Sequence, residues 1–350
     1  MGRIALITCR EAESADDVGS SGWIKRLFKG FYELLAARGL QEAGLSIASD
    51  AVPEICVIEI PFPVNFLSAC GERTLGKLKK WISDECARLE VRFCLYSGEL
   101  LQKTRLAPAE TDSGRFGEYL FKALLPGVME EIFLQRGIRP GELDIAVIAG
   151  HSRTELLTVL SCVLPMVKYI TVVTHDKEQI REEAGRIFEE TGLSMMVTSD
   201  YEASLKYSDL IINLGNLHGE GTRIKPNRRS IILNYGHKNV PDRLAENTVI
   251  NGVAITLPGQ LQAFPGDRII NRFDKGQLAW VMLTMKLFGD VCRELPDCAR
   301  LRQIYRAFRS EGYGIAEYAG RHGTVGKEQI RIVMPVEDSS GTSRRRRTGQ

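Results

Sequence analysis

Short, continuously apolar segments recur between residues 144 and 255, and stretches with helical spacing separate most of them. A strand that is apolar at every position has to be buried on both faces, as happens in a parallel sheet that carries helices on both sides. The repetition therefore predicts one doubly wound parallel α/β sheet. We expect its strands at residues 144–149, 169–173, 193–197, 210–213, 230–234 and 249–255.

The regions before and after this sheet predict further units. Apolar runs at 3–9 and 56–61 predict strands, and helical spacing predicts helices at 23–38, 75–93 and 116–137, the last one kinked at Pro126-Gly127. Helices are also expected at 276–292, 298–308 and 313–320, either packing back on the first domain or forming a homodimer contact. The expected division is an N-terminal α/β substrate-type domain at 1–140, a Rossmann-like domain at 141–262, C-terminal helices at 263–335 and a disordered basic tail at 336–350.

Composition excludes several classes of protein. Hydrophobic residues make up 44% of the 350-residue chain and charged residues 26%, which excludes a disordered or fibrous protein. The formal net charge of +2 includes four consecutive arginines at 344–347, so the rest of the chain is slightly acidic, which argues against a nucleic-acid partner. No apolar stretch is long enough to span a membrane, and the one at residues 4–7 is too short for a signal peptide.

The cysteines point to a reducing compartment. The eight cysteines are scattered, form no C-x-x-C pair and have no spacing typical of zinc sites, so we expect no metal. Reduced thiols and the absence of an export signal predict a cytoplasmic protein, which we expect to be bacterial.

The turn after the first strand of the regular region is where a doubly wound sheet binds a dinucleotide. Such a site favours G-x-G-x-x-G, but of these glycines only Gly150 is present here. One interpretation is that Ser152, Arg153 and Thr154 bind a phosphate through hydroxyls and charge. The other is that Ser152 and Glu155 form a capping box, which uses the same backbone amides. The sequence leaves both open.

Asp176 follows the second strand of the regular region. An acidic residue at this place binds the ribose hydroxyls of NAD and would repel the additional phosphate of NADP. The alternative is that Asp176 only caps the charged helix that follows.

Two glycine-bearing loops follow the fourth and fifth strands. Ligands of doubly wound sheets bind at the carboxyl ends of the strands, so residues of these loops are stronger candidates than residues on helices. The expected cofactor-binding residues there are Asn213, Leu214, Gly215, Tyr235 and Gly236, and the expected catalytic residues are His218, His237 and Lys238. A histidine suits a general acid near neutral pH, although solvated loop histidines are also common.

Cys9 ends the first strand of the chain. Arg10 beside it could lower the pKa of the thiol and make Cys9 a nucleophile, whereas the alternative is a buried, inert cysteine.

One passage resembles the superfamily of shikimate dehydrogenases and glutamyl-tRNA reductases. Residues 208–213 (SDLIIN), 224–227 (IKPN) and 230–236 (SIILNYG) are similar to its passage of aspartate, strand, loop, lysine-proline and strand, and residues 251–254 to the strand that follows. The resemblance implies a substrate domain first, a nicotinamide-binding Rossmann domain second and a helical segment last. In glutamyl-tRNA reductases a cysteine after a threonine near the end of an early strand is the nucleophile, and Thr8-Cys9 looks like that pair.

The order of domains is also similar to that of cyanobacterial long-chain acyl carrier protein reductases, including Arg321-His322-Gly323 near the closing helix. There, a cysteine in the first C-terminal helix carries the acyl group. Our register puts Ala279 at that position, with Cys292 about a dozen residues later.

These observations predict an NAD- or NADP-dependent oxidoreductase that transfers a hydride at a carbonyl or acyl carbon of a small-molecule or acyl-type substrate. The competing hypothesis is a Rossmann-fold binding or regulatory protein that has lost the dinucleotide fingerprint and is not an enzyme.

Overall fold

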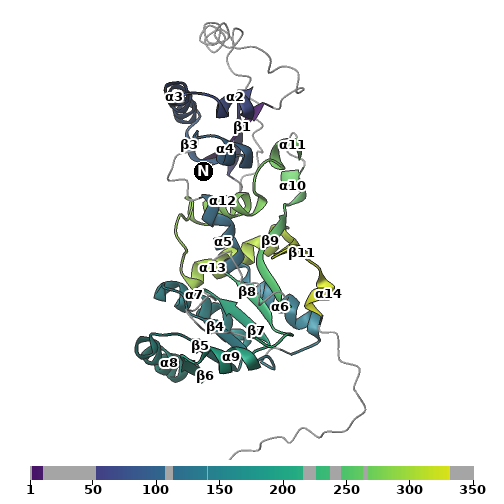
Figure 1. Cartoon of the computed structure of the whole chain (residues 1–350). Helices are drawn as coiled ribbons and strands as arrows, with labels where there is room; N and C mark the ends of the chain where they lie inside the picture. The colour runs from purple at the N-terminus through teal and green to yellow at the C-terminus, as the bar shows by residue number, and fades with distance from the viewer. Residues whose placement is uncertain are drawn as a thin grey trace, which may run out of the picture.

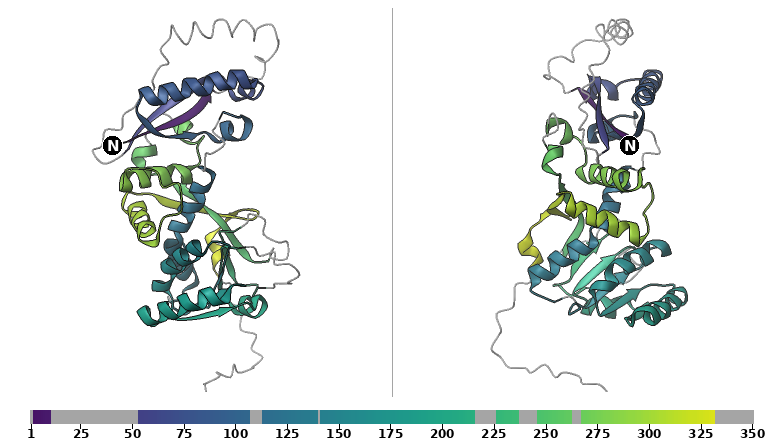
Figure 2. Two further views of the ribbon diagram at one scale, coloured as in Figure 1. Left: turned by 90° about the vertical axis from the view of Figure 1, so that its left-hand side faces the viewer. Right: turned by 180° about the vertical axis from the view of Figure 1, so that it is seen from behind.

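The computed structural model describes residues 2–10, 53–106, 113–139, 141–215, 226–236, 246–262 and 267–331. They form a small and a large sheet at opposite ends of an elongated molecule, with helices between the two (Figures 1 and 2). The expected helix at 23–38 and the expected basic tail at 336–350 lie outside the described residues.

The N-terminal unit alternates strands and helices, which in chain order are β1 (Arg3–Arg10), β2 (Glu54–Pro63), α2 (Val64–Ser68), α3 (Glu72–Arg88), β3 (Val91–Tyr96) and α4 (Gly98–Lys103). Strand β1 lies between β2 and β3 and pairs in parallel with both. One face of this sheet packs under α3 through Leu75, Leu78 and Ile82. The other face carries Ile4 and Leu6 and joins the main hydrophobic core.

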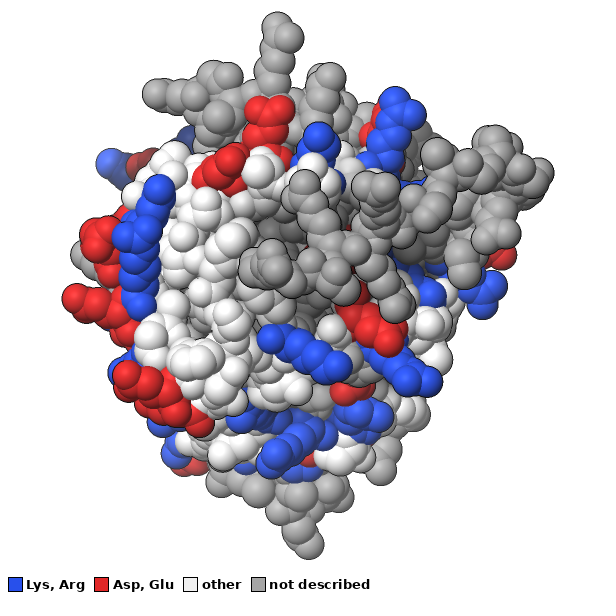
Figure 3. Space-filling model, turned by 90° about the horizontal axis from the view of Figure 1, so that it is seen from below, with Lys and Arg blue, Asp and Glu red and all other residues white. Residues whose placement is uncertain are grey.

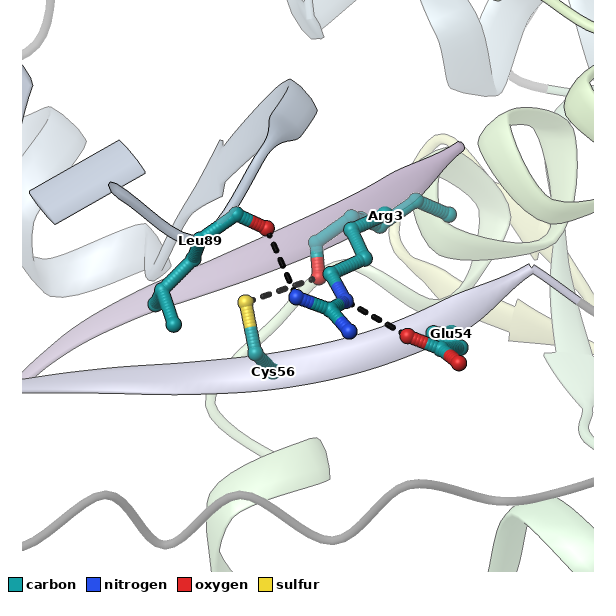
Figure 4. A network of polar contacts seen from close by, with 5 residues as sticks. Arg3, Glu54, Cys56 and Leu89 are labelled. Atoms are coloured by element: carbon teal, nitrogen blue, oxygen red, sulfur yellow. Dashed lines mark hydrogen bonds and ion pairs between the residues drawn. The ribbon is translucent and has the colours of Figure 1, made fainter. Parts of the chain in front are cut away.

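Polar contacts hold the amino ends of these strands together (Figure 4). The Arg3 guanidinium donates to a Glu54 carboxylate oxygen at 2.5 Å and to the Leu89 carbonyl at 3.0 Å. The Cys56 thiol donates to the Ile4 carbonyl at 3.5 Å. One side chain of β1 therefore contacts both β2 and the residue that follows α3.

The large sheet has eight strands among the described residues, which are β4 (Ile145–Ile148), β5 (Tyr169–Val173), β6 (Ser194–Thr198), β7 (Leu210–Asn213), β8 (Ile231–Asn234), β9 (Thr248–Thr256), β10 (Gly314–Gly320) and β11 (Gly323–Val325). Its order is β11-β10-β9-β8-β7-β4-β5-β6, and β4 to β9 are parallel. Counted from β4, the parallel strands have the order 3-2-1-4-5-6 of the Rossmann fold. The expected doubly wound parallel sheet is confirmed.

Helices cover both faces of the large sheet. The helices that follow the N-terminal unit along the chain are α5 (Ser113–Ala123), α6 (Leu125–Arg136), α7 (Arg153–Val163), η2 (Leu164–Met166), α8 (Lys177–Thr191), α9 (Tyr201–Tyr207), α10 (Gly259–Gln262), α11 (Asp267–Ile270), α12 (Lys275–Phe288), α13 (Cys298–Ser310) and α14 (Lys327–Ile330). Helix α9 packs on one face through Leu205. Helices α5, α6, α7, α12 and α13 share the core on the other face. Trp280 of α12 is fully buried there, and its indole N–H donates to the Cys292 carbonyl at 2.9 Å.

Three expectations about individual elements are wrong. Residues 91–93, expected at the end of a helix, begin β3, because α3 ends at Arg88 and Glu90 turns the chain with a φ of 53°. Residues 113–136 form two helices that break at Leu124, with Pro126 in the first turn of α6, where its missing N–H costs nothing. Residues 313–320, expected as a helix, form β10, which pairs antiparallel with β9 and covers the edge that the parallel sheet would otherwise expose.

Helices α5 and α6 lie within the stretch expected to form the N-terminal domain. They pack mainly on elements that come later in the chain, in the large-sheet region and the C-terminal segment. Helix α5 contacts α12, α13 and β9, and α6 contacts α7 and α14. Helix α12 separates the two sheets, and the carbonyl of Gly289 at its end accepts a hydrogen bond from Arg92 of β3 at 3.1 Å. The C-terminal segment thus contacts the N-terminal unit at this point.

Charge is mixed on the surface of the large-sheet end. In the face seen from below (Figure 3), Lys and Arg side chains alternate with Asp and Glu side chains around an uncharged area. The tip of α8 beside the edge strand β6 contributes apolar surface, since Phe188 is 56% exposed and Met196 43% exposed. None of the described helices is long and apolar enough to cross a membrane.

Candidate functional site

Three glycines meet at the carboxyl ends of β4, β7 and β8, and we call Gly150, Gly215 and Gly236 the glycine cluster. A Cβ on Gly150 would lie 2.4 Å from the Leu214 carbonyl oxygen, and one on Gly215 would lie 2.5 Å from that of Ala149. A Cβ on Gly236 would lie 2.1 Å from the Gly215 carbonyl oxygen. Because the neighbouring atoms belong to backbone, only glycine lets the turns after these strands approach so closely.

A row of asparagines, which we call the asparagine ladder, crosses the same edge. The Asn213 amide donates to the Asn234 side-chain oxygen at 2.7 Å, and the Asn234 amide donates to that of Asn251 at 2.9 Å. Asn213 also accepts from the Gly215 backbone N–H at 3.2 Å. Asn213 and Asn234 are buried, so the ladder satisfies amides that would otherwise be costly to bury and fixes the strand ends beside the glycine cluster.

The amino end of α7 contains the turn for which the sequence left capping and phosphate binding open. Ser152 is the N-cap, and its hydroxyl accepts from the Glu155 N–H at 3.2 Å. The Glu155 carboxylate does not complete a capping box but pairs at 2.5 Å with Lys122, a lysine of α5 that is nearly fully buried. The amides of Arg153 and Thr154 have no hydrogen-bond partner among the described residues and remain available to an anion.

Arg153 and Thr154 differ in their surroundings. Thr154 is exposed. The Arg153 guanidinium pairs with Glu183 of α8, although half of the arginine side chain stays exposed. Arg153 therefore joins α7 to α8 and would contact a bound phosphate only if this ion pair changed.

Asp176 stands at the carboxyl end of β5, before α8. It occupies the N-cap position of this helix, but its side chain accepts no capping hydrogen bond and is exposed. The Asp176 N–H donates to the Thr174 hydroxyl at 3.2 Å, which shapes the turn. The interpretation that Asp176 caps α8 through its side chain is therefore wrong, and its carboxylate is free of this role.

Leu214 and Tyr235, both expected at the cofactor site, are buried. The Tyr235 ring packs on Phe121 of α5 with centroids 4.3 Å apart, and its hydroxyl donates to the Phe121 carbonyl at 3.4 Å. Burial raises the pKa of Tyr235 well above its ordinary value. The Tyr235 side chain anchors the turn after β8 to α5, while Gly215 and Gly236 line the edge. His218, His237 and Lys238 lie outside the described residues.

Cys9 lies in the small sheet, not at the edge of the large one. It is fully buried at the end of β1, and Arg272 donates to its sulfur at 3.2 Å and to its carbonyl at 2.5 Å. Burial raises the pKa of Cys9 more than the Arg272 charge lowers it. The structure thus favours the buried, inert interpretation, and the arginine at Cys9 is Arg272 instead of the expected Arg10.

Two hydroxyls that the sequence analysis missed lie next to Cys9. Thr8 of β1 and Ser97 after β3 are fully buried, and their side-chain oxygens have no hydrogen-bond partner within the described part of the chain. The pairing of Ile7 with Tyr96 continues through the Ser97 N–H, which donates to the Ile7 carbonyl at 2.9 Å, so Thr8 and Ser97 are neighbours. Each of the two hydroxyl residues follows a buried apolar residue towards the end of its strand, and this position is the sequence signal that could have identified them.

The residues at the carboxyl edge of the large sheet fit a nicotinamide dinucleotide. Free amides at the start of α7 suit a pyrophosphate, and the exposed Asp176 carboxylate suits a ribose diol. The Cβ-free surface of the glycine cluster lies along the same edge, after β4, β7 and β8. Within the described ranges, no three His, Cys, Asp or Glu side chains are grouped so that they could hold a metal ion.

Comparison with known proteins gives structural matches only. No family model and no curated protein sequence matches the chain. Shikimate 5-dehydrogenase from Listeria monocytogenes, solved with shikimate and NAD, is 11% identical over 94% of both chains with a TM-score of 0.31. Dipicolinate synthase A chain from Bacillus subtilis is 12% identical, over 89% of this chain and 97% of that one, with a TM-score of 0.30. Quinate dehydrogenase from Corynebacterium glutamicum, solved with NAD, is 12% identical, over 87% of this chain and 99% of that one, with a TM-score of 0.28.

Proposed function

We propose that this chain is an NAD-dependent oxidoreductase that transfers a hydride at a carbonyl or acyl carbon of a small substrate. The observation that carries the proposal is the position of Asp176. In a sheet of order 3-2-1-4-5-6, its carboxylate is exposed at the end of the second strand and does not cap α8. A carboxylate without a structural role at this place is what recognition of a ribose diol requires.

The dinucleotide would bind along the carboxyl edge of the large sheet. Its pyrophosphate would accept from the free amides at the start of α7, beside the Ser152 hydroxyl, and its nicotinamide end would face Gly215 and Gly236. When bound, the nicotinamide supplies or accepts the hydride. The protein's part is to orient both reactants and to move a proton, for which His218, His237 and Lys238 remain the candidates.

The choice of NAD over NADP follows from charge. An NADP phosphate on the ribose would stand next to the Asp176 carboxylate, and two like charges at hydrogen-bond distance repel each other. Lys177 and His175 flank Asp176 in the chain, and a positive charge on them would reduce this repulsion. The Asp176 carboxylate would still stand next to the phosphate, so part of the repulsion would remain.

The substrate would approach from the N-terminal unit. The hydroxyls of Thr8 and Ser97 are buried and have no hydrogen-bond partner among the described residues, and a buried hydroxyl without a partner is costly unless something else binds it. A carbonyl or carboxylate oxygen of a small substrate accepts hydrogen bonds from two such neighbouring hydroxyls. Covalent catalysis by Cys9 would be a variant of this scheme, but the burial and raised pKa of the thiol weigh against it.

The second candidate function is a binding or regulatory protein that does not use a dinucleotide. It is favoured by the first turn, where Ser152 takes the place of the second fingerprint glycine and Glu155 that of the third. Ser152 caps the Glu155 amide, and Glu155 pairs with the buried Lys122, so the protein itself uses part of the place where a phosphate would bind.

Titration with NADH and NADPH, followed by nicotinamide fluorescence and by the unfolding midpoint, decides between the two functions. The matched variants are Asp176→Asn and Glu178→Gln, which remove one negative charge each in the same turn. Glu178 is 85% exposed and pairs with Arg181, so it serves as the control. We expect NADH to bind with micromolar affinity and Asp176→Asn to weaken it about tenfold or more, because hydrogen bonds to a charged group contribute about 1.5–3 kcal/mol.

Glu178→Gln should leave the affinity for NADH unchanged. If neither dinucleotide binds at millimolar concentration, the oxidoreductase proposal is wrong and the second function stands. If NADH binds equally well to wild type and Asp176→Asn, the dinucleotide does not use Asp176, and the preference for NAD has no basis.

A further inference from the structure

We infer that Cys162 and Cys298 form a dithiol that low-molecular-weight disulfides oxidise to an intramolecular disulfide. Cys162 lies near the end of α7, and Cys298 is the first residue of α13. Their sulfur atoms are 3.5 Å apart although 136 residues separate them in the chain. This modification site is separate from the proposed dinucleotide site and does not depend on it.

The surroundings of Cys298 favour its thiolate. The first amides of a helix have no partner within the helix, and together with the helix dipole they stabilise an anion at this end. Arg302 lies one turn further along α13, and its guanidinium donates to the Ser161 carbonyl at 2.7 Å, which holds the positive charge next to the two thiols. The hydrogen bond from Cys162 and the charge of Arg302 lower the pKa of Cys298 to about 7, against the opposing effects of burial and of the neighbouring Asp297 charge.

Cys162 has the opposite character. It is buried, and both its contact with Cys298 and its burial raise its pKa far above that of an ordinary thiol. The half-buried Cys298 is therefore the attacking residue, and Cys162 is the resolving residue.

The chemistry requires only a small disulfide such as glutathione disulfide. The Cys298 thiolate attacks one of its sulfur atoms, forms a mixed disulfide and releases one glutathione thiolate, which takes up a proton. Cys162 then gives up its proton and attacks the Cys298 sulfur, which breaks the mixed disulfide and releases the second glutathione. Two protein thiols are oxidised, one glutathione disulfide is reduced to two glutathione thiols, and both protons end on glutathione.

The chain contains an internal comparison. Cys86 and Cys94 have sulfur atoms 3.3 Å apart, but Cys86 lies near the carboxyl end of α3, beside Glu85. The thiol contact lowers the pKa of Cys86, whereas burial and the Glu85 charge oppose this. Arg88, two residues further on, pairs with Glu85 at 2.9 Å, and a helix carboxyl end disfavours a thiolate. Proximity alone therefore predicts equal oxidation of the two pairs, and the proposal predicts that Cys162–Cys298 is oxidised first.

The disulfide would join two parts of the fold. Helix α7 belongs to the first βα unit of the large sheet, and its amino end lies at the carboxyl edge, whereas α13 belongs to the C-terminal segment that packs back. Oxidation would connect them covalently and so oppose separation of α13 from α7.

The experiment uses the reduced full-length chain in a series of glutathione disulfide concentrations, with rapid alkylation to stop exchange and peptide mapping without reductant. Trypsin places Cys162 in the peptide 154–168 and Cys298 in 294–300, and it places Cys86 in 81–88 and Cys94 in 93–103. We expect the first pair of peptides to be linked at least about threefold faster than the second pair. In Cys162→Ser, the mixed disulfide should accumulate on Cys298.

A second measurement does not depend on disulfide formation. The rate of Cys298 alkylation by iodoacetamide, followed against pH, should have a midpoint near the pKa of about 7 in the wild type. The midpoint should move upward in Arg302→Gln, a change that a merely structural arginine would not cause. The inference is overturned if Cys86–Cys94 forms as fast as Cys162–Cys298, if glutathione stays on Cys298 of the wild type, or if the alkylation midpoint is that of an ordinary thiol.

Discussion

Replacing Gly236 by alanine tests the close packing of the glycine cluster. An added Cβ would lie 2.1 Å from the Gly215 carbonyl oxygen and 2.9 Å from the Asn213 side-chain nitrogen. To reach ordinary van der Waals contact, one of the two turns would have to move by more than about 1 Å. Both turns are held by other contacts, since the Gly215 N–H donates to Asn213 and the Tyr235 ring packs on Phe121.

The expected cost of Gly236→Ala is about 3 kcal/mol, at the upper end of the usual range for overpacking, because the obstacle is backbone and not the end of a flexible side chain. For a domain of this size, 1 kcal/mol corresponds to about 2–4 °C, so the unfolding midpoint should fall by about 6–12 °C. Circular dichroism during heating measures this shift. Hydrogen exchange should be faster at the Gly215 amide than in wild type, which locates the strain at the cluster.

Gly185→Ala is the matched control. Gly185 lies in the middle of α8, and its added Cβ would have no atom within 4 Å. The same substitution should therefore raise the stability by about 0.5–1 kcal/mol, because alanine is the better helix former. If Gly236→Ala unfolds at the same temperature as wild type or above it, the turns at the edge are not packed backbone against backbone, and the description of the glycine cluster is wrong.

Two further sets of substitutions test the asparagine ladder and the buried hydroxyls. Asn234→Ala removes both ladder hydrogen bonds and should cost about 2–3 kcal/mol in the free energy of unfolding. A double-mutant cycle with Asn213→Ala should show a coupling energy of about 1 kcal/mol, since the two amides bond to each other. Additive losses in the two variants would contradict the ladder. Thr8→Val and Ser97→Ala should each leave the stability of the chain without substrate unchanged or raise it by about 1 kcal/mol, because the buried hydroxyls have no partner to lose within the part of the chain that the structure describes. A loss above about 1 kcal/mol in urea unfolding would mean that these hydroxyls are satisfied within the protein.

The local sequence pattern was sufficient to predict the parallel strands of the large sheet. The strands expected at 169–173 and 210–213 have those bounds in the structure, and the other parallel strands differ by one or two residues at an end. Strands buried on both faces are apolar at each position, so their sequence contains nearly all the information about their environment. Strand β10 was wrongly predicted as a helix, because its environment is set by its pairing with β9, which is distant in the sequence.

The candidate site was predicted only where a residue's role is local. Ser152 as a helix cap and Asp176 at a strand end follow from their immediate neighbours, and the structure adds that Asp176 does not cap. The partner of Glu155 could not be predicted, because Lys122 comes from a helix assigned to another domain.

The sequence by itself determined the parallel sheet, its strand order along the chain and the turns at its carboxyl edge, since periodicity and helix caps are short-range properties. Only the tertiary structure decided which distant groups meet at close range. It brought Arg272 to Cys9, Cys298 to Cys162 and the turns of the glycine cluster into backbone contact. These contacts depend on how helices and strands pack, and packing is set by the whole core, not by any one segment.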